Sequence, residues 1–148
     1  MTAVLQECLL APDTQPKVIA DCKTLIQQEV SRLSGISGTG VKLAYKTVIK
    51  FAPDHIHYMV ETLLPRLADE LQPFWNEFGA SGGSEFGDYL AKRSDEVSEA
   101  LLSVTDQRAA GSSRPTITKA YGAVRGSAAK HVAAALPDVG ALVQRYAA

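Results

Sequence analysis

The chain has 148 residues, which suits one domain with its own hydrophobic core. Its 15 basic and 16 acidic residues nearly cancel, so the molecule as a whole has no net electrostatic attraction for nucleic acid. The two cysteines, Cys8 and Cys22, lie in apolar stretches and follow neither a zinc-binding nor a redox-active spacing. We therefore expect buried, reduced thiols and disfavour nucleic acid as a partner.

The N-terminal stretch MTAVLQECLLAPD lacks the basic region and the long apolar core of a secretory signal. No run approaches the roughly 18 apolar residues that a membrane span requires. We therefore expect a cytoplasmic protein with no membrane span.

Apolar residues recur every three or four positions almost throughout the chain, and this period is typical of an all-α protein. The pattern predicts helices over about 3–10, 17–33, 39 or 41–52, 116–135 and 136–146. Proline and glycine mark the joints between them, with flexible joints expected near 35–40, 79–83 and 111–115. We predict a single domain of six or seven helices.

Two segments require a decision about where a helix breaks. The apolar pattern runs from Asp54 to Phe78, but Pro65 and Pro73 lie inside it, which predicts two helices or one with a kink near Leu64. From Ser84 the pattern resumes, and a new N-terminal signal at Ser94 predicts a break between Arg93 and Ser94.

The apolar faces of these helices define the expected core. It contains Leu25, Ile26, Val48, Met59, Leu63, Leu67, Leu71, Phe74, Leu90, Val97, Leu101 and Val104.

The stretch SGISGTGVK at residues 34–42 is rich in glycine and hydroxyl groups. It fails as a P-loop because Val41 precedes Lys42, Leu43 replaces the metal-binding hydroxyl, and a helix precedes it instead of a strand. Ser37, Thr39 and Lys42 still form a candidate anion site at a helix start. The alternative is that Gly35 caps one helix and Ser37 or Thr39 caps the next.

The predicted helix ending at Ala52 is amphipathic. At about 100° per residue, Lys42, Lys46 and Lys50 lie on one side, whereas Tyr45 and Phe51 lie on the apolar side. Such a stripe can lie on anionic lipid or a nucleic-acid backbone. We favour a solvated face whose lysines pair with acidic groups of the same molecule.

Other polar residues invite a metal or catalytic interpretation. Asp54, His55, His57 and Glu61 are close in sequence, and His57 and Glu61 are four residues apart, but no complete zinc or di-iron motif is present. No G-x-S-x-G motif occurs, and neither cysteine lies in a polar setting. We therefore assign no catalytic residue, no metal site and no cofactor.

Charge is distributed unevenly: residues 75–110 carry a net charge of −4 and residues 111–148 a net charge of +4. We expect these segments to attract each other, the alternative being a basic face for an anionic partner. Arg93 lies on an apolar face and is expected to pair with Asp88 or Asp106; if it is buried, it is a candidate anchor for a ligand carboxylate.

Five stretches together resemble one family of short, helical bacterial proteins, common in actinomycetes, which is classed as a domain of unknown function. They are APDTQPKVIADC, SGISGTGVK, LQPFWNEF, FGDYLAKRSDEVSEALLSVTDQR and HVAAALPDVGALVQRYA, and they cover nearly the whole chain. The resemblance implies a free-standing cytoplasmic protein and no particular activity.

The leading functional hypothesis is a non-enzymatic interaction or small-ligand-binding protein, with a homodimer among the options. Its surface is expected at Trp75 and Phe78, beside the glycine-rich joint. The alternative is an enzyme or binder of an anionic phosphate or carboxylate compound, held by Lys42 and Arg93.

Overall fold

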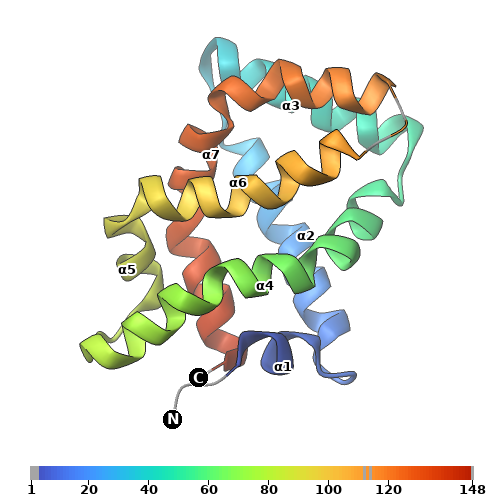
Figure 1. Cartoon of the computed structure of the whole chain (residues 1–148). Helices are drawn as coiled ribbons and strands as arrows, with labels where there is room; N and C mark the ends of the chain where they lie inside the picture. Colours follow the sequence, from blue (N-terminus) through green and yellow to red (C-terminus); the bar gives the residue numbers. More distant parts are fainter. Residues whose placement is uncertain (1–3, 112, 114, 148) are drawn as a thin grey trace.

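A computed structural model describes residues 4–111, 113 and 115–147. Along these residues the protein forms seven α-helices and no β-strand (Figure 1), so the prediction of an all-α domain is confirmed. The helices are α1 (Leu5–Leu10), α2 (Gln15–Ser31), α3 (Gly35–Phe51), α4 (His55–Ser81), α5 (Phe86–Lys92), α6 (Ser94–Ala110) and α7 (Pro115–Ala147).

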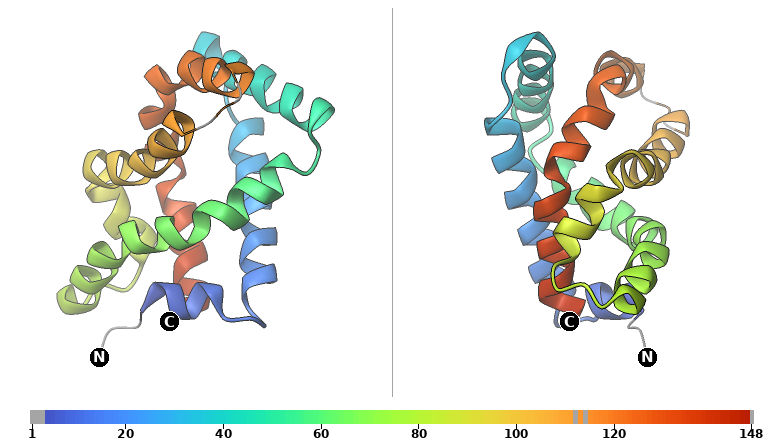
Figure 2. Two further views of the ribbon diagram at one scale, coloured as in Figure 1. Left: turned by 45° about the vertical axis from the view of Figure 1, so that its right-hand side comes forward. Right: turned by 90° about the vertical axis from the view of Figure 1, so that its left-hand side faces the viewer.

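The two longest helices, α4 and α7, organise the fold. Each packs against α1, α2, α3, α5 and α6, and no contact between α4 and α7 is found among the described residues. Figures 1 and 2 show that α7 turns partway along: its first part crosses the top of the molecule beside α3, and its second part descends toward the two chain ends. The other five helices in the described part of the chain therefore pack against both of these long helices.

The prolines at 65, 73 and 137 lie inside these two helices. Of the two arrangements predicted for residues 54–78, the structure has the single helix, whereas the separate last helix predicted to begin at Leu136 is wrong. Each interior proline removes one helical hydrogen bond. In α4 this cost is offset by burial on both sides of Pro65, with Leu63 and Leu64 before it and Ala68 and Leu71 after it.

The joints differ from the predicted ones in two places. Residues 35–40 are the first turns of α3, which begins at Gly35 with a φ of 77° that favours glycine. Gly82, with a φ of 73°, ends α4 in the left-handed conformation, so this joint covers 82–85. The predicted break is confirmed, since α5 ends at Lys92 and α6 begins at Ser94. The joint at 111–115 lies partly outside the described residues.

An aromatic core joins α4 to α5. Trp75 meets Phe86 edge-on at 4.9 Å between ring centroids, and Phe78 lies 5.3 Å from Phe86. Trp75 and Phe78 are only 7% and 6% exposed, so the predicted interaction surface at these residues is wrong. The joint after α4 returns the chain so that α5 covers both rings.

Helices α5 and α7 approach closely at two glycines. A Cβ atom on Gly140 would lie 2.3 Å from the Gly87 backbone, and one on Gly87 would lie 2.4 Å from the Pro137 carbonyl oxygen. Gln144 strengthens this contact: its Oε1 accepts the Phe86 N–H at 2.9 Å and its Nε2 donates to the Ser84 carbonyl at 2.9 Å. The second part of α7 and the start of α5 thus form one tightly packed unit.

The core prediction is correct in part. Five of the expected residues are buried: Leu63, Leu71, Leu90, Val97 and Val104. The other expected residues are half-buried: Leu25, Ile26, Val48, Met59, Leu67, Phe74 and Leu101. The core predicted from the sequence omitted several side chains that are buried: Leu5, Leu9, Val18, Ile19, Trp75, Phe78, Phe86, Leu136, Leu142 and Val143.

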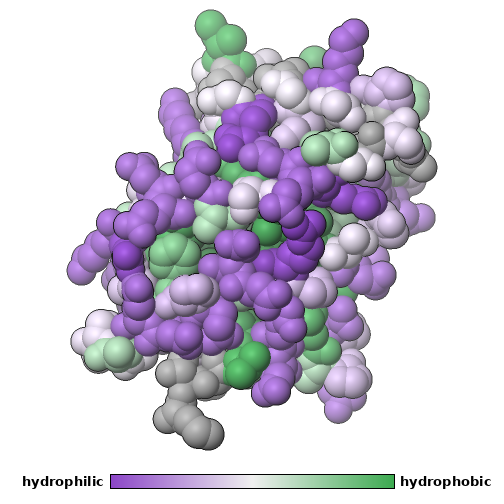
Figure 3. Space-filling model, in the orientation of Figure 1, coloured by the Kyte–Doolittle hydropathy of each residue, from purple (hydrophilic) through white to green (hydrophobic). Residues whose placement is uncertain are grey.

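The opposite end of the molecule is positively charged and leaves large apolar side chains exposed. We call α3 together with residues 115–134 of α7 the basic end, because these stretches contain lysine and arginine but no aspartate or glutamate. Phe51, expected on a buried face, is 75% exposed. Figure 3 shows hydrophobic side chains among hydrophilic ones along this upper edge.

No helix in the described parts of the chain has both the length and the apolar character needed to cross a bilayer.

Candidate functional site

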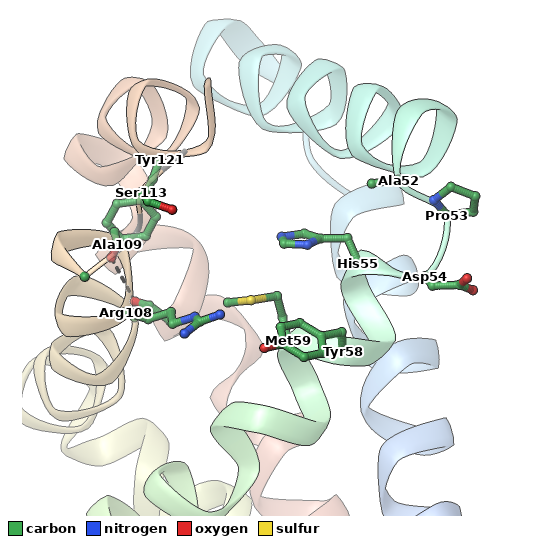
Figure 4. Close-up of a pocket in the computed structure, with 12 residues that line it drawn as sticks. Ala52, Pro53, Asp54, His55, Tyr58, Met59, Arg108, Ala109, Ser113 and Tyr121 are labelled. Carbon is green, nitrogen blue, oxygen red and sulfur yellow. Dashed lines mark hydrogen bonds between the residues drawn. The ribbon is translucent and has the colours of Figure 1, made fainter. Parts of the chain in front are cut away.

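A pocket of about 690 Å³ lies between the start of α4, the end of α6 and α7. Figure 4 shows its walls, with the His55 ring and the Met59 thioether pointing into the space and the Asp54 carboxylate pointing away. The pocket is lined by Ala52, Pro53, Asp54, His55, Tyr58, Met59, Thr105, Arg108, Ala109, Gly111, Ser113 and Tyr121.

Arg108 is the cation of this pocket. Its guanidinium lies over the Tyr58 ring, 5.8 Å from the centroid, which fixes the side chain between α6 and α4. Among the residues that the structure describes, no carboxylate lies within ion-pair distance of Arg108. Its planar set of N–H donors is therefore available to a bound molecule.

A polar network closes the α7 side of the pocket. The Tyr121 hydroxyl donates to Asp106 Oδ1 at 2.5 Å and lies 2.8 Å from the Thr105 hydroxyl. Arg125 holds the same carboxylate with two hydrogen bonds, Nε to Oδ1 at 2.8 Å and a terminal nitrogen to Oδ2 at 3.1 Å. These contacts join α6 to the first part of α7.

The network shifts the pKa values of Asp106 and Tyr121. The hydrogen bonds from Arg125 and Tyr121 hold the pKa of Asp106 below its usual range. Burial, together with the hydrogen bond to the Asp106 carboxylate, raises the pKa of Tyr121. The network therefore keeps Asp106 charged and Tyr121 protonated at neutral pH.

The residues considered for a metal do not converge. His57 and Glu61 are exposed and lie 3.9 Å apart across one turn of α4, while His55 lines the pocket. Within the described residues, no group of three His, Cys, Asp or Glu side chains is arranged to hold a metal ion.

The sequence-based anion site is spread over the molecule. The Thr39 hydroxyl donates to the Gly35 carbonyl at 2.8 Å inside α3, and the Ser37 side chain lies outside the described residues. Lys42 is half-buried on α3, which in the described part of the chain makes no contact with α5 or α6, whereas Arg93 lies between those two helices. The structure does not bring Lys42 and Arg93 together.

Arg93 is held by partners other than the expected Asp88 and Asp106. It forms ion pairs with Glu77 and, at 3.1 Å, with Glu96, and it donates to the Tyr89 hydroxyl at 2.7 Å. Hydrogen bonds from Tyr89 and Arg93 lower the pKa of Glu77. Arg93 therefore links the end of α4 to the α5–α6 break, and its charge is already neutralised.

The two cysteines are free thiols, and both are half-buried instead of buried as expected. Burial raises the pKa of the Cys22 thiol to about 11, with a smaller contribution from the Asp21 charge. Cys22 is therefore not an activated nucleophile at neutral pH.

Comparison with known proteins gives one finding about this fold. The model of a family of unknown function, DUF6918, matches residues 5–147. The chain belongs to this family. The resemblance noted in the sequence to a family of unknown function is thereby confirmed. No curated protein and no solved structure gives a significant match. Because DUF6918 is a family of unknown function, membership in it assigns no activity to the pocket.

Sequence reasoning missed Arg108 and Tyr121 as site residues. The pocket is assembled from residues 52–59, 105–113 and 121, which no local motif connects. The available signal was indirect, because two of these stretches flank the predicted joints at Pro53 and at 111–115.

Proposed function

We propose that the protein binds a small organic molecule with a carboxylate or phosphate group in the pocket lined by Arg108 and Tyr58. The observation that carries this proposal is the Arg108 guanidinium, which is fixed on the pocket wall and has no carboxylate partner among the described residues.

The size and lining of the pocket support a small-molecule ligand. A volume of about 690 Å³ lies within the range of roughly 300–1,000 Å³ that is usual for ligand sites. Tyr58, Met59 and Ala109 offer apolar surface to the body of a ligand, whereas Arg108 and His55 offer N–H donors to its charged group. Asp54 points away from the space, so it does not repel an anion there (Figure 4).

This proposal retains the ligand-binding hypothesis from the sequence but moves the anion-binding role from Lys42 and Arg93 to Arg108. Arg93 is neutralised by Glu77 and Glu96, and Lys42 lies on another part of the fold. Self-association and a cytoplasmic location remain predictions.

The test is a thermal-shift screen of the purified chain against organic carboxylates and organic phosphates. A ligand of this class, present at about 100 times its dissociation constant, should raise Tm by about 5 °C or more. Arg108→Ala should remove most of this rise, because it removes the only guanidinium that the described part of the pocket contains.

Arg66→Ala is the matched control. Arg66 is an exposed arginine of α4 that donates a hydrogen bond to Gln107, next to Arg108 in sequence, and it does not line the pocket. This variant should retain the full ligand-induced rise. The proposal is contradicted if no compound of either class stabilises the protein, or if both variants lose the rise equally.

A further inference from the structure

We infer that the outer face of α3 docks onto the surface of an anionic lipid bilayer. The outer face comprises Ile36, Leu43, Phe51, Lys46 and Lys50. This inference rests on exposure and charge at the basic end and is independent of the proposed ligand pocket.

Exposed apolar side chains are concentrated on this helix. Ile36 is 97% exposed, Phe51 75% and Leu43 65%. On a wheel with Lys42 at 0° and about 100° per residue, Leu43, Ile36 and Phe51 fall at about 100°, 120° and 180°. They form one stripe along the helix, and large apolar side chains grouped in this way mark an interaction surface.

The lysines form the border of that stripe. On the same wheel, Lys46 and Lys50 fall at about 40° and 80°, and both are exposed. The half-buried side of α3 lies opposite, with Val41, Val48 and Tyr45 between about 240° and 300°. An apolar stripe with lysines along one edge is suited to a helix that lies flat at a membrane surface.

The lysines of α3 are available to an outside partner. The sequence interpretation expected acidic groups of the same molecule to neutralise Lys42, Lys46 and Lys50, but no described carboxylate pairs with any of them. The acidic residues of 75–110 are instead used by Arg93 and Arg125. On the neighbouring α7, residues 115–134 add the exposed Lys119 and Lys130 and no acidic residue, whereas Arg125 is already paired with Asp106.

A lipid surface satisfies both properties of this face. A second copy of the chain packed through this face would bring more lysines and no acidic residue of α3, and a nucleic-acid backbone would leave Ile36 and Leu43 in water. A bilayer with anionic headgroups attracts the lysines and accepts the apolar side chains at its acyl boundary. Because the contact is small, the attachment is expected to be reversible and sensitive to salt.

The test is flotation of the full chain with vesicles. Vesicles of phosphatidylcholine containing about 30% phosphatidylglycerol should bind the protein at least about tenfold more tightly than pure phosphatidylcholine vesicles, and added salt should weaken binding. Lys46→Glu/Lys50→Glu should reduce binding about tenfold or more. Leu43→Ser/Phe51→Ser should also reduce it while leaving the lysines in place.

Lys23→Glu/Lys92→Glu is the control, because it makes the same change in net charge at exposed lysines of α2 and α5. This variant should bind the anionic vesicles nearly as well as the wild type. Equal weakening by both lysine pairs would overturn the inference, as would equal binding to neutral and anionic vesicles. Dimerisation that Leu43→Ser/Phe51→Ser abolishes, without vesicle binding, would assign the face to a second copy instead, and double-stranded DNA binding without vesicle binding would equally overturn it.

Discussion

The two ends of α7 lie in contrasting surroundings. Its second part packs against the aromatic core and meets α5 at a glycine contact, and it supplies the buried side chains of Ala135, Leu136, Leu142 and Val143. Its first part is joined to α6 by the Asp106–Arg125 ion pair and the Tyr121 hydroxyl. One helix therefore passes from an apolar, close-packed region into one held by polar contacts.

The close-packed end contributes most of the stability, whereas the end with polar contacts offers the surfaces that we propose for binding. Apolar burial and close packing stabilise the fold strongly, whereas exposed ion pairs contribute little each. The end with the weaker contacts also bears the pocket and the exposed face of α3, both of which leave polar or apolar groups available to other molecules. We therefore expect the same type of substitution to change the free energy of unfolding differently at the two ends.

The largest contrast is expected between two phenylalanines. Phe86 is completely buried against Trp75, so Phe86→Ala should lower the free energy of unfolding by about 4 kcal/mol through lost burial and a cavity. Phe51 is 75% exposed, so Phe51→Ala should change it by less than about 0.5 kcal/mol. Urea denaturation followed by circular dichroism measures both. Similar losses in the two variants would show that the basic end is packed as tightly as the aromatic core.

Two glycines of α7 give the next contrast. Gly140→Ala should destabilise the protein by about 2 to 3 kcal/mol, because the new methyl group would meet the Gly87 backbone, which cannot move aside as a side chain can. Gly126→Ala is the matched control in the same helix, where no described atom outside the surrounding helix backbone lies within 4 Å of the added Cβ. It should stabilise the protein by about 0.5 to 1 kcal/mol through higher helix propensity. The same urea experiment decides, and a stable Gly140→Ala variant would mean that α5 and α7 can separate without cost.

The helices were predictable because their signals are local. The three-to-four residue period identified the all-α fold, and Ser94 followed by two acidic residues identified the break between α5 and α6. The interior prolines left two arrangements open for residues 54–78 and led to a wrong helix boundary at Leu136, for the opposite reason. Their local cost is visible in the sequence, but the burial on both sides of Pro65 that offsets it depends on helices distant in the chain.

The site was much less predictable than the fold. Arg93 and Arg108 have the same side chain and lie on or beside the same helix, yet Glu77 and Glu96 neutralise one while the other faces a pocket. Glu96 is a local partner, three residues from Arg93, but Glu77 reaches Arg93 only through the packing of α4 against the α5–α6 break, and no spacing rule encodes that approach. Trp75 was misassigned similarly, since only the return of α5 over its ring reveals that it is buried.

The smallest effect that we predict concerns pH at the basic end. Because the folded-state pKa of Asp106 is lowered, its carboxylate contributes stability above the usual value of 3.8, and this contribution is lost as pH falls through the lower folded-state pKa. As pH falls below about 5, the hydrogen-exchange protection factors of amides within 115–130, taken relative to the intrinsic rate at each pH, should therefore decrease before the fluorescence of Trp75 reports loss of the aromatic core. Asp106→Asn should produce faster exchange in this segment already at pH 7.

Glu77→Gln is the control for Asp106→Asn. Glu77 is also a carboxylate with a lowered pKa and an arginine partner, but it lies beside the aromatic core. Its replacement should leave exchange within 115–130 unchanged at pH 7. If both variants accelerate exchange there, the two ends unfold together and α7 transmits the loss along its whole length. If only Asp106→Asn does so, the Asp106–Arg125 pair holds the first part of α7 on α6, and the pocket wall formed by Tyr121 depends on that one ion pair.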